Sequence, residues 1–179
     1  MSHKKQYDAV ARSFHGIMAV MMIGLLAAGL YMSDLDPSPQ KWQIYGIHKA
    51  LGITILALVV LRILWRAGNQ PPSPLPSQAA WEHRLSKLIH FLLYFGMIAM
   101  PVSGYIMSSA GGHDVSIFGL FNLPLIIEKN EQTGEIAKEI HELGGNALIA
   151  AIVLHTLGAL KHYFIDRDST VHRMFNFIR

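Results

Sequence analysis

The sequence predicts an all-α membrane protein, a bundle of four transmembrane helices with both termini in the cytoplasm. Composition is the first observation, because 51% of the 179 residues are hydrophobic and only 15% are charged, a balance unlike that of a soluble domain. The second observation is four apolar runs, each near the ~20 residues that a helix needs to cross the hydrocarbon core. We expect one domain over residues 1–179, with helices over about 10–32, 44–66, 85–107 and 134–164.

The first apolar run follows a basic segment, as the core of a secretion signal does. Lys4, Lys5 and Arg12 precede it. Its apolar stretch is longer than the ~7 to 15 residues of a signal core, however, and Leu30–Ser33 lacks a small-residue cleavage pattern. This run is therefore predicted to be the first transmembrane helix. The prolines and aspartates of Ser33–Gln40 then predict a turn.

Prolines separate the second helix from the third and interrupt the third. Ala67–Ser77 contains four prolines, which lack the backbone N–H that helices use, so this stretch is predicted to be a stiff extended linker. Pro101 lies inside the third apolar run and predicts a kink near Gly104.

The connection between the third and fourth helices is the longest. Its middle part, Ser116–Ile127, is apolar and aromatic but broken by a glycine and a proline, which favours a segment lying at the membrane surface. The fourth helix is predicted to begin near Thr133, a candidate N-cap. The tail after Asp166 predicts a short helix or turn.

The basic residues orient the predicted bundle. Most of the 15 lysines and arginines fall on the side of both termini, and only four fall on the other side, Lys41, Lys49, Lys129 and Lys138. The positive-inside rule then places both termini in the cytoplasm. The basic residues are spread over several helix ends and form no stripe, so we expect no nucleic-acid binding.

The chain contains no cysteine. This excludes disulfides, iron–sulfur clusters held by thiolates and covalent attachment of c-type haem. Any metal or haem group must therefore be held by histidine.

Two histidines of the fourth predicted helix carry the main functional signal. His141 and His155 are fourteen residues apart, so they lie within ~40° of one another around the helix and ~21 Å apart along it. Histidine is costly in hydrocarbon and tends to be kept there for a function. One histidine near each edge of a bilayer favours two stacked metal cofactors, which points to haem and to electrons crossing a membrane.

Depth along the predicted helices sorts four of the ten histidines into two layers. His48 pairs with His141 near the outer edge, and His15 pairs with His155 near the inner edge. Each is followed four residues later, on the same helix face, by a glycine or an alanine, which leaves room for a flat porphyrin.

Other residues leave alternatives open at the inner layer. His90 and His162 compete for the inner pair, since spacing alone does not exclude them. Arg62 lies fourteen residues after His48 and either binds a haem propionate or extends to the interface as a boundary residue. The remaining histidines lie in polar flanks or loops and are expected to be solvated.

Two alternatives to haem need no porphyrin. The histidines could hydrogen-bond between helices in a bundle without cofactor, some of them as a proton relay. Zinc is a weaker alternative, because ligands ~21 Å apart cannot share an ion and each layer offers only two nitrogens. Four histidines in two matched layers favour haem over both.

Several short motifs occur in order along Tyr7 to Asp168. They are Arg12-Ser-Phe-His15, Ile47-His48-Lys49, the proline-rich linker, Pro101-Val-Ser-Gly104, Phe118-Gly-Leu, His141-Glu and Lys161-His162-Tyr163. Together they resemble the bacterial di-haem cytochrome b561 family. The chain is also similar to the haem b membrane subunits of nickel hydrogenases and formate dehydrogenases.

The resemblance implies a multi-pass cytochrome of the bacterial inner membrane with two b-type haems. By the family's pattern, His48 and His141 would hold the outer haem, and His15 and His155 the inner haem. Members that work alone are superoxide oxidases that reduce ubiquinone, which implies superoxide, ubiquinone and membrane lipid as partners. The alternatives are an electron-transfer subunit of a dehydrogenase or hydrogenase, with a redox partner protein, and a haem-free channel or transporter.

Four further residues are candidates for the substrate sites. Lys49 is adjacent to His48 and would draw an anion toward the outer haem, or else it is an interfacial lysine. Lys161, His162 and Ser13 are quinone-site candidates by the resemblance and by their depth at the inner end, with interfacial anchoring as the alternative.

Overall fold

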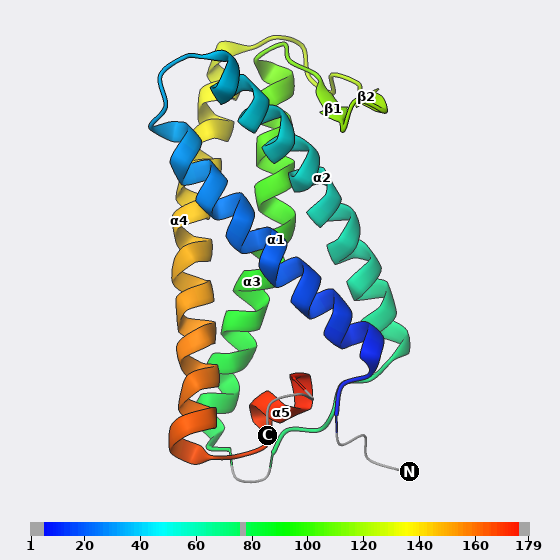
Figure 1. The fold of residues 1–179 in the computed structure, drawn as a ribbon, viewed down its shortest axis with the longest axis vertical. Helices are drawn as coiled ribbons and strands as arrows, with labels where there is room; N and C mark the ends of the chain where they lie inside the picture. Colours follow the sequence, from blue (N-terminus) through cyan, green and yellow to red (C-terminus); the bar gives the residue numbers. More distant parts are fainter. Residues whose placement is uncertain (1–5, 76–77, 176–179) are drawn as a thin grey trace.

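The computed structural model describes residues 6–75 and 78–175 (Figure 1). Each of its four long helices is long and apolar enough to cross a membrane, and they are α1 (Ala9–Ser33), α2 (Pro39–Gly68), α3 (Ala80–Ala110) and α4 (Glu131–Lys161). The predicted all-α membrane protein with a four-helix bundle is confirmed.

The long helices begin before the predicted ranges, and for α2 and α4 the reason is that the capping residue lies outside the apolar run. α4 itself ends at Lys161, before the predicted end near 164. α2 begins at Pro39, after Ser38, whose Oγ accepts a hydrogen bond from the Lys41 N–H at 3.2 Å. Asn130 caps α4 by accepting a hydrogen bond from the Thr133 N–H at 2.9 Å. The prediction that Thr133 is the N-cap is therefore wrong, since Thr133 is the capped residue.

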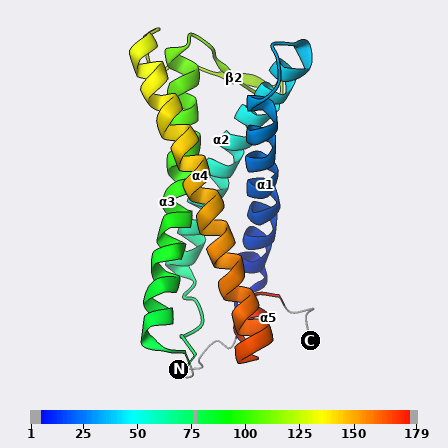
Figure 2. The same ribbon diagram turned by 90° about the vertical axis from the view of Figure 1, so that its left-hand side faces the viewer.

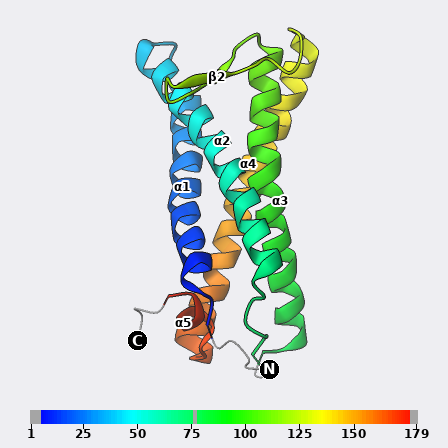
Figure 3. The ribbon, with the colours of Figure 1, turned by 90° about the vertical axis from the view of Figure 1, so that its right-hand side faces the viewer.

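The helices alternate in direction, which gives the bundle two different ends. The α1–α2 turn and the α3–α4 connection lie at one end, called here the hairpin end (Figure 1). The short helix α5 (Thr170–Met174) lies at the other, called here the α5 end. The most extensive helix packing is between α3 and α4 (Figure 2), and α2 runs obliquely between α1 and α3 (Figure 3).

The α3–α4 connection contains a hairpin that the sequence did not predict. β1 (Val115–Ile117) pairs antiparallel with β2 (Phe121–Leu123). Three residues connect the strands, and the first two, Phe118 and Gly119, both have positive φ, 52° and 75°. Positive φ at both central residues is what a type I′ turn requires. Apolar side chains are exposed at this turn, with Leu120 80% exposed.

The chain changes helix type where α4 ends. A π-helical turn, η1 (His162–Asp166), follows α4 directly. Arg167 then has a left-handed φ of 52° and turns the chain toward α5. Short π-helical segments are frequent at functional sites, and this one contains the candidate residue His162.

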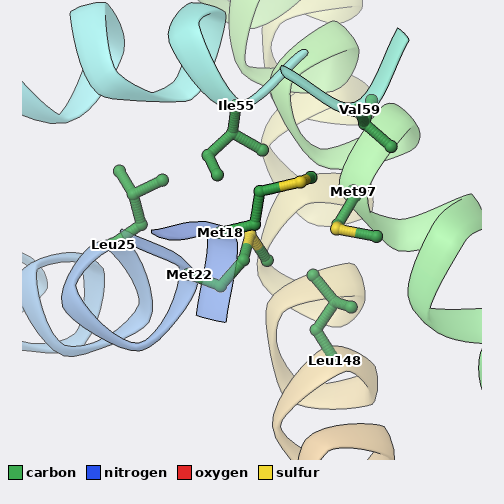
Figure 4. Packing of buried hydrophobic residues seen from close by; sticks show 7 residues of the cluster. All are labelled: Met18, Met22, Leu25, Ile55, Val59, Met97 and Leu148. Carbon is green, nitrogen blue, oxygen red and sulfur yellow. The ribbon is translucent and has the colours of Figure 1, made fainter. Parts of the chain in front are cut away.

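The hydrophobic core is a cluster of buried side chains between the helices (Figure 4). All four long helices contribute to it, through Met18, Met22, Leu25, Ile55, Val59, Met97 and Leu148. Leu148 is seven residues from both His141 and His155, so the core separates the two predicted histidine layers. A Cβ on Gly96 would overlap with the Leu148 side chain, which explains why α3 has a glycine there.

Leu148→Ala should destabilise the bundle, because Leu148 is 2% exposed and packs in this cluster. We expect a loss of about 2 to 5 kcal/mol, typical of a leucine truncated in a closed core. Leu143→Ala is the matched control, since Leu143 is on the same helix and 72% exposed, and it should change stability by less than about 0.5 kcal/mol. Unfolding of the detergent-solubilised protein measures both. Equal losses in the two variants would contradict this assignment of the core.

Candidate functional site

Two pairs of imidazole rings face one another between α4 and the first two helices. His48 of α2 and His141 of α4 have ring centroids 6.1 Å apart. His15 of α1 and His155 of α4 have ring centroids 6.2 Å apart. All four side chains are half-buried. The structure thus brings together the two pairs that depth along the chain predicts.

The geometry of both pairs fits coordination of one metal ion between two rings. Two imidazoles on opposite sides of an iron, each with a metal–nitrogen distance of about 2 Å, have ring centroids about 6 Å apart. No hydrogen bond joins the two rings of either pair in the described part of the chain. The Nδ1 atoms of His15 and His48 are buried without a hydrogen-bond partner there, so these two rings do not link helices through Nδ1, whereas His141 of α4 does bond to α3. The donor set and spacing suit b-type haem.

A third imidazole lies beside the inner pair. The His90 ring centroid of α3 is 5.3 Å from that of His155, closer than His15 is. His90 is more exposed than either ring of the pair, whereas Phe175 packs edge-on against His15 at 5.5 Å. His90 is therefore the nearer ring, but the 6.2 Å between His15 and His155 matches the separation expected for one shared metal, and enclosure also favours His15.

Arg62 places a positive charge at the inner pair. Its guanidinium lies near His15, His90 and His155, and its Nε donates a hydrogen bond to the Tyr94 hydroxyl at 2.9 Å. Arg62 is half-buried, so it points into the bundle and does not simply mark its boundary. This place suits an anionic group such as a haem propionate.

Lys49 lies at the hairpin end, next to His48 in sequence. Its Nζ donates to the Asp114 carbonyl at 2.9 Å and to the Ser108 hydroxyl at 3.2 Å. These two bonds hold the positive charge of Lys49 in place beside the outer pair. The Asp114 carboxylate lies near enough to interact with that charge, but it does not bond to Nζ. The side chain reaches the α3–α4 connection at the hairpin end.

Lys161 and His162 join a cluster of carboxylates at the α5 end. Lys161 forms ion pairs with Glu82 at the start of α3 and with Asp166 of η1. The Nδ1 of buried His162 lies 2.8 Å from the Asp168 carboxylate and 3.0 Å from Asp166. Partial burial raises the pKa of Asp168, but hydrogen bonds from Thr170 and His162 outweigh it and hold that pKa below its usual value.

The sequence analysis missed these carboxylates, although Asp166 and Asp168 follow directly after the fourth apolar run. Ser13, the third quinone-site candidate, lies on the exposed face of α1. It makes no hydrogen bond within residues 6–75 and 78–175. The structure therefore links Lys161 with His162 and leaves Ser13 outside this cluster.

The family follows from comparison with known proteins. A family model described as prokaryotic cytochrome b561 matches residues 6–177. The chain belongs to the prokaryotic cytochrome b561 family. The expected resemblance is confirmed, and this cytochrome b561 is a multi-pass membrane electron-transfer protein whose family implies b-type haem.

Two relatives cover nearly the whole of this cytochrome b561. Cytochrome b561 homolog 2 of Escherichia coli (strain K12) is 32% identical over 177 residues, which span 95% of this chain and 91% of the relative. A protein of Yersinia pestis described as probable superoxide oxidase CybB is 29% identical over 173 residues, 96% of each chain. The family thus includes a probable oxidoreductase.

Proposed function

We propose that this cytochrome b561 binds two b-type haems and carries single electrons from superoxide at the hairpin end to ubiquinone at the α5 end. The observation that carries the proposal is the pair of facing imidazoles at each of two levels, with ring centroids 6.1 and 6.2 Å apart. The two levels are ~21 Å apart along α4. When bound, b-type haem supplies reversible one-electron transfer.

His48 and His141 would hold the haem at the hairpin end, and His15 and His155 the haem at the α5 end. The chain would contribute imidazole nitrogens to hold each haem, and it supplies an apolar layer between the two sites, centred on Leu148. Arg62 would bind a propionate of the inner haem. These residues orient the cofactors and keep water away from the interior.

The distribution of charge supports a bacterial inner-membrane orientation. The α5 end carries many arginines and lysines in described helix ends, among them Arg62, Arg66, Arg84, Lys161 and Arg173. By the positive-inside rule this end would face the cytoplasm and the hairpin end the periplasm. Superoxide formed in the periplasm would then meet Lys49, while quinone would be reduced at the cytoplasmic side of the membrane.

Superoxide oxidation is supported by the description of the Yersinia pestis relative as a probable superoxide oxidase. In this chain the charge of Lys49 beside His48 would attract the superoxide anion. Its Nζ is fixed by Ser108 and Asp114, which keeps the charge at one position.

Quinone reduction requires protons as well as electrons. His162 is buried and hydrogen-bonded to Asp168, so it can hold a proton near the membrane interface and be resupplied through that carboxylate. Lys161 is engaged by Glu82 and Asp166 and would anchor this cluster. We therefore favour His162 over Lys161 and Ser13 as the proton donor.

The haem assignment is tested by the haem content per chain of purified variants. His48→Ala and His155→Ala should each lose one of two equivalents, because each removes one axial ligand. His90→Ala should keep both, and His15→Ala should lose one. A colourless wild-type protein prepared with adequate haem supply would exclude haem. Loss in His90→Ala with retention in His15→Ala would instead make His90 the inner ligand.

Superoxide oxidation is tested by stopped-flow mixing of the oxidised protein with superoxide. We expect rapid haem reduction in the wild type and a reaction about tenfold slower in Lys49→Ala, with a weaker dependence on ionic strength, because the steering charge is lost. Lys41→Ala is the matched control, since Lys41 is at the same end but bonds to the Leu35 carbonyl. Slow, unsaturable reduction of the wild type would reject this substrate and favour a partner enzyme as donor.

Proton delivery is tested by steady-state turnover with a soluble ubiquinone analogue. His162→Ala and Asp168→Asn should lower turnover about tenfold or more, typical of a lost general acid, while haem reduction by superoxide stays at the wild-type rate. His172→Ala, at the same end of the bundle, should leave turnover unchanged. Wild-type turnover in His162→Ala would place the donor elsewhere.

A further inference from the structure

A short part of α3 encloses one edge of the His141 imidazole. The Met100 carbonyl oxygen lies 3.0 Å from His141 Nδ1, and the Ser103 hydroxyl lies 3.1 Å from the same nitrogen. A Cβ on Gly104 would lie 3.1 Å from His141 Cε1 and 3.3 Å from Nδ1. In Pro101-Val-Ser-Gly104, Ser103 therefore contacts this ring, and Gly104 leaves the space that the ring occupies.

These contacts fix the tautomer of His141. A carbonyl oxygen can only accept a hydrogen bond, so Nδ1 carries the proton and donates it to Met100. The Ser103 hydroxyl donates its own proton to the same carbonyl at 2.9 Å, which leaves its oxygen lone pairs for His141 Nδ1–H. Two acceptors therefore share this N–H, and the lone pair for a metal is on Nε2.

The same contacts restrict where the His141 ring can lie. Ser103 is 6% exposed, and its hydroxyl is tied to the helix backbone, so it has little freedom to move. Gly104 lets the ring approach α3, and any larger residue would push against Cε1. The Nδ1 of His48, across the pair, is buried without a hydrogen-bond partner in the described residues, so the outer pair is asymmetric.

We propose that Ser103 and Gly104 are positioning residues for His141, which hold its Nε2 toward the outer haem and lower the reduction potential of that haem. The physical reason is that an imidazole N–H donating to good acceptors makes the other nitrogen a stronger ligand and stabilises the oxidised metal. The inference rests on the proposed haem between His48 and His141. α3, which supplies neither ligand of that haem, would then influence its reduction potential through the hydrogen bonds to His141.

Redox titration of the purified holoprotein, followed by its visible spectrum, tests the role of Ser103. Ser103→Ala should keep both haems and shift one potential to a more positive value, with the other unchanged, because one of the two acceptors is lost. Ser86→Ala is the matched control, since Ser86 makes the same hydrogen bond to a carbonyl three residues earlier on α3. Both potentials unchanged in Ser103→Ala, or the same shift in Ser86→Ala, would overturn the proposal.

Gly104→Ala tests the restriction on the ring by electron paramagnetic resonance of the oxidised protein. The added Cβ should displace His141 and change its angle to His48, now 70°, so one low-spin haem signal should shift or be lost while the other stays. Gly134→Ala is the control, because a Cβ there meets only Ala110 at an ordinary 3.8 Å. A Gly104→Ala spectrum identical to the wild type would overturn this part.

Haem content and reduction potentials together separate a missing outer haem from a missing effect of Ser103. A wild-type protein with no haem, or retention of both haems in His141→Ala and in His48→Ala, would reject the outer haem site itself. Two haems with wild-type potentials in Ser103→Ala would reject only the positioning role.

Discussion

The geometry of α4 is the constraint on which the rest of the structure depends. Fourteen residues complete almost four helical turns, so His141 and His155 share one face and lie at two depths. Leu148 lies midway between them on the same face and closes the core against Gly96 of α3. A single helix face therefore supplies a polar group, an apolar seal and a second polar group, and the other helices are arranged to match this order.

At each of the two histidine levels, a different helix supplies the imidazole that faces α4. At the hairpin end α4 meets His48 of α2, and α3 contributes hydrogen-bond acceptors to His141. At the α5 end α4 meets α1 through His15, with His90 of α3 beside His155. Polar groups inside a membrane require partners within the protein. His141 meets that requirement through α3, whereas the Nδ1 atoms of His48 and His15 have no hydrogen-bond partner in the described residues, so two similar sites have different surroundings.

The charged side chains also differ between the two ends of the bundle. At the hairpin end the Lys49 ammonium group donates to a hydroxyl and to a backbone carbonyl, which are both neutral groups. At the α5 end Lys161, His162 and the carboxylates of Glu82, Asp166 and Asp168 form a connected network between α3 and the end of α4. The fixed charge of Lys49 suits attraction of an anion, and the network suits movement of protons.

The sequence by itself determined the class of protein, the four helices and the depth of each histidine, because apolar run length and helical period are local properties. It did not reveal the hairpin around Phe118, the N-cap Asn130 or the carboxylates that hold His162, since these depend on turn geometry and on partners distant in the chain. Only the tertiary structure decided which groups contact one ring: His90 comes near His155, and Ser103 near His141. Such contacts are set by the rotation and closeness of packed helices, which periodicity along one helix does not specify.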